Sequence, residues 1–176
     1  MTRDAATRRR TALVLTASDR SAAGTREDAS GEALAARLRD LGFDVERQLV
    51  PDDREAIAAR LRDAAGSCAL IVTTGGTGLT PRDVTPQATL DVVDYEVPGL
   101  AEAMRAEGRA KTPFASLSRS VVGVLGRTLI VNTPGSPKAA MESFEAIVPV
   151  LEHALDTLAG PFDHAAAAGV TTGGDA

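Results

Sequence analysis

The glycine-rich segment of residues 73–86, TTGGTGLTPRDVTP, constrains this chain more than any other feature. It begins where the apolar run of residues 69–72 ends, so its glycines follow a predicted buried strand. In an open α/β sheet, ligands bind at the carboxyl ends of the strands. Glycines at 75, 76 and 78 leave backbone N–H groups accessible to an anion, and threonine hydroxyls can add donors. The segment therefore predicts a phosphate-binding loop at the edge of a sheet.

A glycine-rich turn can also simply join a strand to a helix, because glycine is the usual residue of tight turns. This segment lacks the lysine of the P-loop and the glycine spacing of the dinucleotide fingerprint. It carries more hydrogen-bonding residues than a connector needs, and Asp83 adds a carboxylate just before a predicted helix start at Thr85-Pro86. A glycine-rich cradle beside a fixed carboxylate suits nucleotide chemistry with a metal ion.

The rest of the chain alternates predicted strands with predicted helices. We expect strands at 11–16, 43–50, 69–74, 118–125 and 128–132, and helices at 33–41, 54–65, 86–93, 99–107 and 138–158, the last interrupted by Pro149. This alternation predicts an α/β fold with three αβα layers, in which helices cover both faces of a mostly parallel sheet. Residues 11–160 are expected to form one domain, between a disordered basic arm (1–10) and a disordered tail (161–176).

Composition excludes several classes of protein. With one Tyr and no Trp in 176 residues, the core must come mainly from Leu, Val, Ile and Ala. A net charge of -5 argues against general nucleic-acid binding. The single cysteine, Cys68, excludes an intramolecular disulfide and a Cys-rich metal site. No apolar run approaches the ~20 residues that span a bilayer, and the N-terminus has no apolar signal segment. We therefore expect a cytoplasmic protein that binds neither nucleic acid nor membrane.

Four polar loops follow predicted strands, at residues 16–19, 51–52, 74–83 and 132–138. If these strands are parallel, the loops gather at one edge of the sheet. Acidic side chains would then lie beside the phosphate-binding glycines, which is costly unless a divalent cation lies between them. Mg²⁺ suits this position, because it binds through one or two carboxylates and phosphate oxygens. The loops predict a Mg²⁺–nucleotide site.

Five segments resemble, in order, the motifs of the MogA/MoaB family, the molybdopterin adenylyltransferases of molybdenum cofactor biosynthesis. They are LVLTASDR (13–20), DASG (28–31), LVPD (49–52), the glycine-rich segment and NTPGSPK (132–138). The resemblance implies a MogA/MoaB-like fold and transfer of AMP from ATP to molybdopterin with release of pyrophosphate. It also implies Mg²⁺ as cofactor, ATP as co-substrate, a homotrimer or hexamer, and a downstream enzyme that inserts molybdate.

The resemblance also assigns roles to individual residues. The catalytic carboxylates, which would also bind the metal, are Asp52 and Asp83. The residues that would bind the nucleotide are Thr74, Gly75, Gly76, Thr77 and Gly78. The residues that would contact the pterin or its phosphate are Ser18, Asp19, Asn132, Pro134, Gly135, Ser136 and Lys138.

Structural roles are open for the same side chains. Asp52 can cap the following helix, and Asp83 can cap a helix or balance Arg82. Asn132 can satisfy backbone groups in its turn, and Lys138 can be a solvated residue at a helix start. For the whole chain, one alternative is a MoaB-type protein that binds pterin or nucleotide with little adenylyltransferase activity. Another is a scaffold or assembly protein, which would depend on oligomer surfaces alone.

Overall fold

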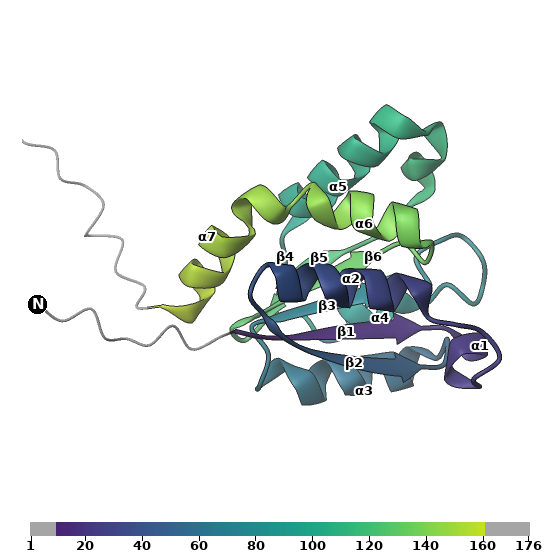
Figure 1. Cartoon of the computed structure of the whole chain (residues 1–176), viewed down its shortest axis with the longest axis horizontal. Coiled ribbons are helices and arrows are strands. Elements are labelled where there is room, and N and C mark those ends of the chain that lie inside the picture. The colour runs from purple at the N-terminus through teal and green to yellow at the C-terminus, as the bar shows by residue number, and fades with distance from the viewer. Residues whose placement is uncertain (1–9, 161–176) are drawn as a thin grey trace, which may run out of the picture.

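A computed structural model describes residues 10–160, which build one six-stranded sheet with helices on both faces (Figure 1). The strands lie in the order β2 (Asp44–Val50), β1 (Thr11–Ala17), β3 (Leu70–Thr74), β6 (Thr128–Thr133), β5 (Val122–Leu125) and β4 (Tyr95–Glu96). The first four are mutually parallel, whereas β5 is antiparallel to β6 and β4 is antiparallel to β5. The predicted α/β fold with a mostly parallel sheet is confirmed.

The helices divide between the two faces of the sheet (Figure 1). One face carries α2 (Ala29–Asp40), α5 (Pro98–Lys111), α6 (Pro137–Glu145) and α7 (Val148–Ala159), and the other carries α3 (Arg54–Ala65) and α4 (Thr85–Leu90). The short α1 (Asp19–Ala22) and the 3₁₀ helix η1 (Pro113–Leu117) lie in connections. Because both faces are covered, the central strands β3 and β6 are buried along their whole length, with apolar residues in the middle and polar ones at their carboxyl ends.

The register of the parallel strands brings their carboxyl ends to one level. Ala17 of β1 lies opposite Val50 of β2, and Thr74 of β3 pairs with Thr16 of β1 and with Thr133 of β6. The loops that follow β1, β2, β3 and β6 therefore leave the sheet side by side. This shared edge positions the candidate site described below.

Two predicted helices have different bounds in the structure. The first begins at Ala29 instead of residue 33, because the Asp28 side chain caps it by accepting the N–H of Gly31 at 2.9 Å. The predicted helix at 138–158 is two helices, α6 and α7, which are separated at residues 146–147. Pro149 lies in the first turn of α7, where no helical N–H bond is lost.

Other boundary predictions were wrong for local reasons. The strand expected at 118–125 begins only at Val122, because Ser118 and Ser120 bond to each other through their hydroxyls (3.0 Å) after η1. The helix expected at 86–93 ends at Leu90, and Val92 turns into the core instead. The two-residue strand β4 was not predicted.

The expected N-terminal arm and C-terminal tail lie outside the described residues, except for Arg10. The Arg10 guanidinium forms an ion pair with Asp156 of α7, so it is held on the domain. Within residues 10–160, no helix has the length and apolar character needed to cross a bilayer.

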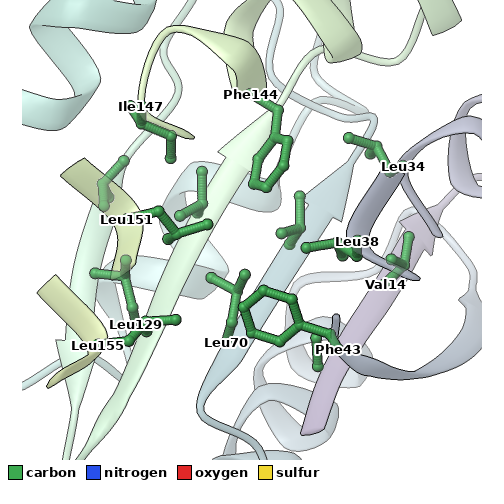
Figure 2. Close-up of a cluster of buried hydrophobic side chains, with 14 of the residues drawn as sticks. Val14, Leu34, Leu38, Phe43, Leu70, Leu129, Phe144, Ile147, Leu151 and Leu155 are labelled. Atoms are coloured by element: carbon green, nitrogen blue, oxygen red, sulfur yellow. The ribbon is translucent and has the colours of Figure 1, made fainter. Parts of the chain in front are cut away.

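The larger core cluster lies between the sheet and the helices α2, α6 and α7. Figure 2 shows Phe144 of α6 above the sheet, with Leu34 of α2 and Ile147 nearby. The Phe144 ring is 0% exposed and is the largest of the fully buried side chains. It therefore fills the space where α6 and α2 meet over the parallel strands.

We expect Phe144→Ala to lower the free energy of unfolding by about 3–5 kcal/mol, because the cavity left by the ring cannot be filled by its rigid neighbours. Val150→Ala is the control, since that side chain is 48% exposed on α7, and its effect should stay within about 0.5 kcal/mol. Urea denaturation of both variants measures the difference. Equal losses would contradict the placement of Phe144 as a main core residue.

Candidate functional site

A cavity of about 430 Å³ opens at the carboxyl edge of the parallel strands. Its walls come from the loops after β1, β2, β3 and β6 and from the start of α2. The predicted site residues that line it are Ser18, Asp52, Thr74, Gly75, Gly76, Asp83, Gly135 and Ser136. Segments far apart in the sequence thus meet at the edge where the sequence places a ligand.

The remaining predicted residues lie around this cavity. A second cavity of about 280 Å³, with mostly apolar walls, lies on the other side of the glycine loop and is lined by Thr77, Gly78 and Pro134. Asp19, Asn132 and Lys138 line neither cavity. The glycine loop is therefore a wall shared between two cavities.

Close backbone contacts explain the glycines of the two loops. Gly75 has φ +98°, and a Cβ atom there would lie 2.3 Å from the carbonyl oxygen of Ala17. Gly76 has φ +64°, and its Cβ atom would lie 2.4 Å from Oγ1 of Thr85. A Cβ atom on Gly135 would lie 3.3 Å from Cα of Gly75. A side chain at Gly75 or Gly135 would press against a neighbouring strand-end loop, and one at Gly76 would press against Thr85 at the start of α4.

Two donors that the sequence suggested for a phosphate are used inside the protein. The N–H of Gly75 donates to the carbonyl of Thr133 at 3.2 Å, and the hydroxyl of Thr74 donates to the carbonyl of Pro134 at 2.7 Å. These bonds join the end of β3 to the end of β6. Both groups therefore hold the two loops together, and other donors must serve a bound anion.

The carboxylate of Asp83 is fixed by its own loop. Its Oδ2 atom accepts hydrogen bonds from the backbone N–H (2.8 Å) and the hydroxyl (2.7 Å) of Thr80. Partial burial alone would raise the pKa of Asp83, but these bonds, a further one from the N–H of Gly78 and the charge of Arg119 lower it below its ordinary value. Asp83 therefore presents a fixed, ionised carboxylate to the cavity. It does not pair with Arg82 or cap α4.

Asp52 and Asp19 cap each other's backbone. The N–H of Asp19 donates to Oδ2 of Asp52 (3.1 Å), and the N–H of Asp52 donates to Oδ1 of Asp19 (3.0 Å). The bond from the Asp52 N–H lowers the pKa of Asp19, as does the ion pair with Arg82. The residue that caps α3 is Asp53, whose Oδ1 accepts the N–H of Ala56 at 2.8 Å. Asp52 therefore does not cap α3, and it lines the cavity.

Asn132 is fully buried below the loops. Its amide nitrogen donates to the hydroxyls of Thr73 (3.0 Å) and Thr89 (2.9 Å), and its Oδ1 accepts the N–H of Val121 at 3.3 Å. Its side chain thus links β3, α4 and the start of β5 to β6. A direct contact with a ligand would require this network to open.

At the start of α6, Ser136 lines the cavity and caps the helix by accepting the N–H of Ala139 at 3.3 Å. Lys138 follows two residues later, and its side chain is exposed. The lysine thus lies beside the cavity without closing it.

Several residues that line the cavity were not among the predicted site residues, namely Arg26, Glu27, Asp28, Ser30 and Arg82. Asp28 also accepts the hydroxyl of Thr16 (2.9 Å) and pairs with Arg47 (2.9 Å), in addition to capping α2. A signal existed for Arg82, because it lies within the glycine-rich segment. No local pattern marked residues 26 and 27, which reach the cavity only through the turn after α1.

The acidic residues fit a cation that arrives with phosphate oxygens. Within residues 10–160, no group of three or more His, Cys, Asp or Glu side chains is arranged to hold a metal ion. Asp52 and Asp83 nevertheless both line the same cavity. Mg²⁺ is commonly bound by one or two carboxylates together with substrate phosphates. The donor set therefore suits a nucleotide-bound Mg²⁺ better than a permanent metal centre.

Comparison with known proteins places this geometry in context. Residues 13–153 match a protein family described as a probable molybdopterin binding domain. The chain is 38% identical over 154 residues to the molybdopterin adenylyltransferase of Helicobacter pylori, which covers 85% of this chain and 88% of that protein.

Two solved structures are similar over the same domain. The molybdopterin biosynthesis enzyme MoaB from Thermus thermophilus is 51% identical, with a TM-score of 0.78 over 85% of this chain and 96% of that one. The molybdopterin biosynthesis Mog protein from Mycobacterium ulcerans is 42% identical, with a TM-score of 0.81 over 85% of this chain and 99% of that one.

The close contact between Gly75 and the carbonyl of Ala17 can be tested by substitution. Gly75→Ala should destabilise the protein more than Gly24→Ala, because both glycines have positive φ but only a Cβ atom on Gly75 would strike a backbone carbonyl. We expect the two losses in free energy of unfolding to differ by roughly 1–3 kcal/mol, the usual cost of overpacking. Thermal and urea unfolding measure both. A difference near zero would mean that the loops separate without cost.

Proposed function

The chain belongs to the MogA/MoaB family of molybdopterin-binding proteins in molybdenum cofactor biosynthesis, and we propose that it is a molybdopterin adenylyltransferase. In this reaction AMP passes from ATP to the terminal phosphate of molybdopterin, and pyrophosphate leaves. The observation that carries the proposal is the position of Asp52 and Asp83, which line one cavity with the glycine loop. The 38% identity to an adenylyltransferase over most of both chains supports it.

The cavity offers charges of both signs for two phosphorylated substrates. We assign the nucleotide to the loop of residues 74–78, with Arg26 and Arg82 as cations for its phosphates. Asp52 and Asp83 would hold Mg²⁺, which neutralises phosphate charge during the transfer. The glycines at 75 and 76 keep the loop free of side chains that would exclude the phosphates.

The transfer step needs orientation more than proton movement. The bond that forms joins a phosphate oxygen of molybdopterin to the α-phosphorus of ATP, and the bond that breaks releases pyrophosphate. Because the attacking phosphate is already anionic, neither Asp52 nor Asp83 has to remove a proton. Positioning and electrostatic stabilisation then supply most of the rate, as in other phosphoryl transfers.

We assign the pterin and its phosphate to the β1 and β6 loops. Ser18, Gly135 and Ser136 line the nucleotide cavity, and Pro134 lines the second cavity. Lys138 would face the terminal phosphate from the start of α6. Asp19 and Asn132 would support this side through the bonds described above.

Assembly and cellular context are also proposals from the family resemblance. We expect a cytoplasmic homotrimer or hexamer that passes adenylylated molybdopterin to a molybdate-inserting enzyme. Phe114 and Leu117 line the second cavity, and their side chains are exposed in the single chain. This exposed apolar surface supports a contact with another subunit at that place. Apolar surface of this kind is costly to leave in water.

A second function is supported by the 51% identity to a MoaB enzyme. A MoaB-type protein would bind pterin or nucleotide in the same cavity with little or no transfer. Incubation with molybdopterin and Mg-ATP separates the two functions. Release of pyrophosphate supports the adenylyltransferase, whereas ATP binding without release supports the MoaB-type function.

We expect Asp83→Asn to lower kcat/KM for adenylyl transfer by about two to three orders of magnitude, the scale of losing one electrostatic group at a reacting centre. The fold should persist, because the amide oxygen can still accept the bonds from Thr80. Asp53→Asn is the matched control, since Asn also caps helices and residue 53 lies outside the cavity. Near-normal turnover of Asp83→Asn would remove Asp83 from the catalytic assignment.

Lys138→Ala tests the division between the two substrates. Loss of a charged hydrogen bond should raise the apparent KM for molybdopterin by a factor corresponding to about 1.5–3 kcal/mol, or one to two orders of magnitude. Calorimetry of ATP alone should show little change, and Lys138→Arg should retain most of the affinity. Equal weakening of both substrates would place Lys138 on phosphates that they share.

A further inference from the structure

Arg119 binds the glycine loop from outside both cavities. It lies between η1 and β5 and lines neither cavity. Its Nε donates to the carbonyl of Gly78 at 2.7 Å, and its Nη2 donates to the carbonyl of Asp83. Its backbone N–H donates to the carbonyl of Thr77 at 3.1 Å. Three of its donors thus hold three carbonyl groups of one loop.

The two bonds of the guanidinium group span the turn from Gly78 to Asp83. The inside of this turn is held by the Asp83 carboxylate, which accepts bonds from both the N–H and the hydroxyl of Thr80. The outside is held by Arg119. A planar guanidinium with a rigid arrangement of donors can bridge two carbonyl groups, whereas the single ammonium of lysine is a point charge. The residue type therefore matches the geometry of the turn.

We propose that Arg119 is a positioning residue, which holds the 78–83 turn so that the Asp83 carboxylate meets the Mg²⁺–nucleotide complex at a fixed place. This inference rests on the proposed function in one respect: adenylyl transfer is taken as the reaction that uses the fixed position of the Asp83 carboxylate. Arg119 lines neither cavity, so it would act on a ligand only indirectly, by holding the loop backbone and by the charge that it places near Asp83. Because transfer between two anions depends on orientation, a small displacement of Asp83 should cost rate without loss of the fold.

The neighbours of Arg119 argue against a role in stability alone. Ser118 and Ser120 line the second cavity, and Arg105 reaches the same segment by donating to the carbonyl of Ser120 at 3.0 Å. The segment is thus anchored by other bonds. The side chain of Arg119 is directed instead at the two carbonyls that bound the Asp83 turn.

The test uses Arg119→Lys in the full chain, with Arg127→Lys as control. Arg127 also donates to a backbone carbonyl, that of Ala159 at 3.1 Å, but it precedes β6 at the opposite edge of the sheet. Two quantities are measured, namely kcat from pyrophosphate release and the Mg²⁺ concentration for half-maximal ATP binding by calorimetry. Melting temperatures identify any loss of folded protein, and Arg119→Gln provides a second variant that retains only an amide donor.

We expect Arg119→Lys to lower kcat by roughly 10–100-fold and to raise the half-maximal Mg²⁺ concentration by a similar factor, the usual range for groups that orient a metal ligand. ATP affinity at saturating Mg²⁺ should be nearly unchanged, and Arg127→Lys should behave as the wild type. Wild-type Mg²⁺ dependence in folded Arg119→Lys would overturn the positioning role. A wild-type protein that releases no pyrophosphate, yet shows the Mg²⁺ shift in the variant, would refute the proposed reaction alone.

Discussion

The site depends on backbone-to-backbone contact between the loops that leave β1, β3 and β6. Parallel register brings these strand ends to one level, but the loops can touch only where no side chain separates them. Gly75 meets the carbonyl of Ala17 and the backbone of Gly135, and its own N–H is bonded to Thr133. The glycines therefore close the edge of the sheet into a cavity wall. Their role in building this wall precedes any role in binding a phosphate.

The loops at this edge of the sheet carry several carboxylates, and the fold stabilises their negative charge with hydrogen bonds, mostly from backbone N–H groups. Asp19 and Asp52 exchange N–H bonds, and Asp83 takes two bonds from Thr80. These bonds lower the pKa values of Asp19 and Asp83, and nearby arginines contribute, Arg82 at Asp19 and Arg119 at Asp83. Asp53 caps α3, so the adjacent carboxylate remains available to a ligand. The adjacent residues Asp52 and Asp53 thus have different roles: Asp53 caps α3, and Asp52 lines the cavity.

Much of this arrangement could be predicted from the sequence, because its main signals are local. Apolar runs marked the central strands, and the polar loops after them marked the edge where the cavity lies. The two residues of β4 have no such signal, because both are exposed and pair only at the end of the sheet. The contribution of Arg26 and Glu27 could not be predicted either. It depends on how the segment between α1 and α2 reaches the cavity, which is a tertiary property.

Asn132 illustrates a second limit of prediction from the sequence. Its motif predicts a ligand contact, and its place at a strand end agrees with that prediction, yet its side chain lies 0% exposed among threonines. The buried amide bonds to β3, to α4 and to the residue before β5, and it thereby fixes the ends of β3 and β6 relative to α4. In the proposed adenylyl transfer, which would need no proton removal, the rate would rest on how accurately the loops hold two anions in line. Residues such as Asn132 can then influence catalysis without meeting a substrate, because the cavity wall moves only if their hydrogen bonds break.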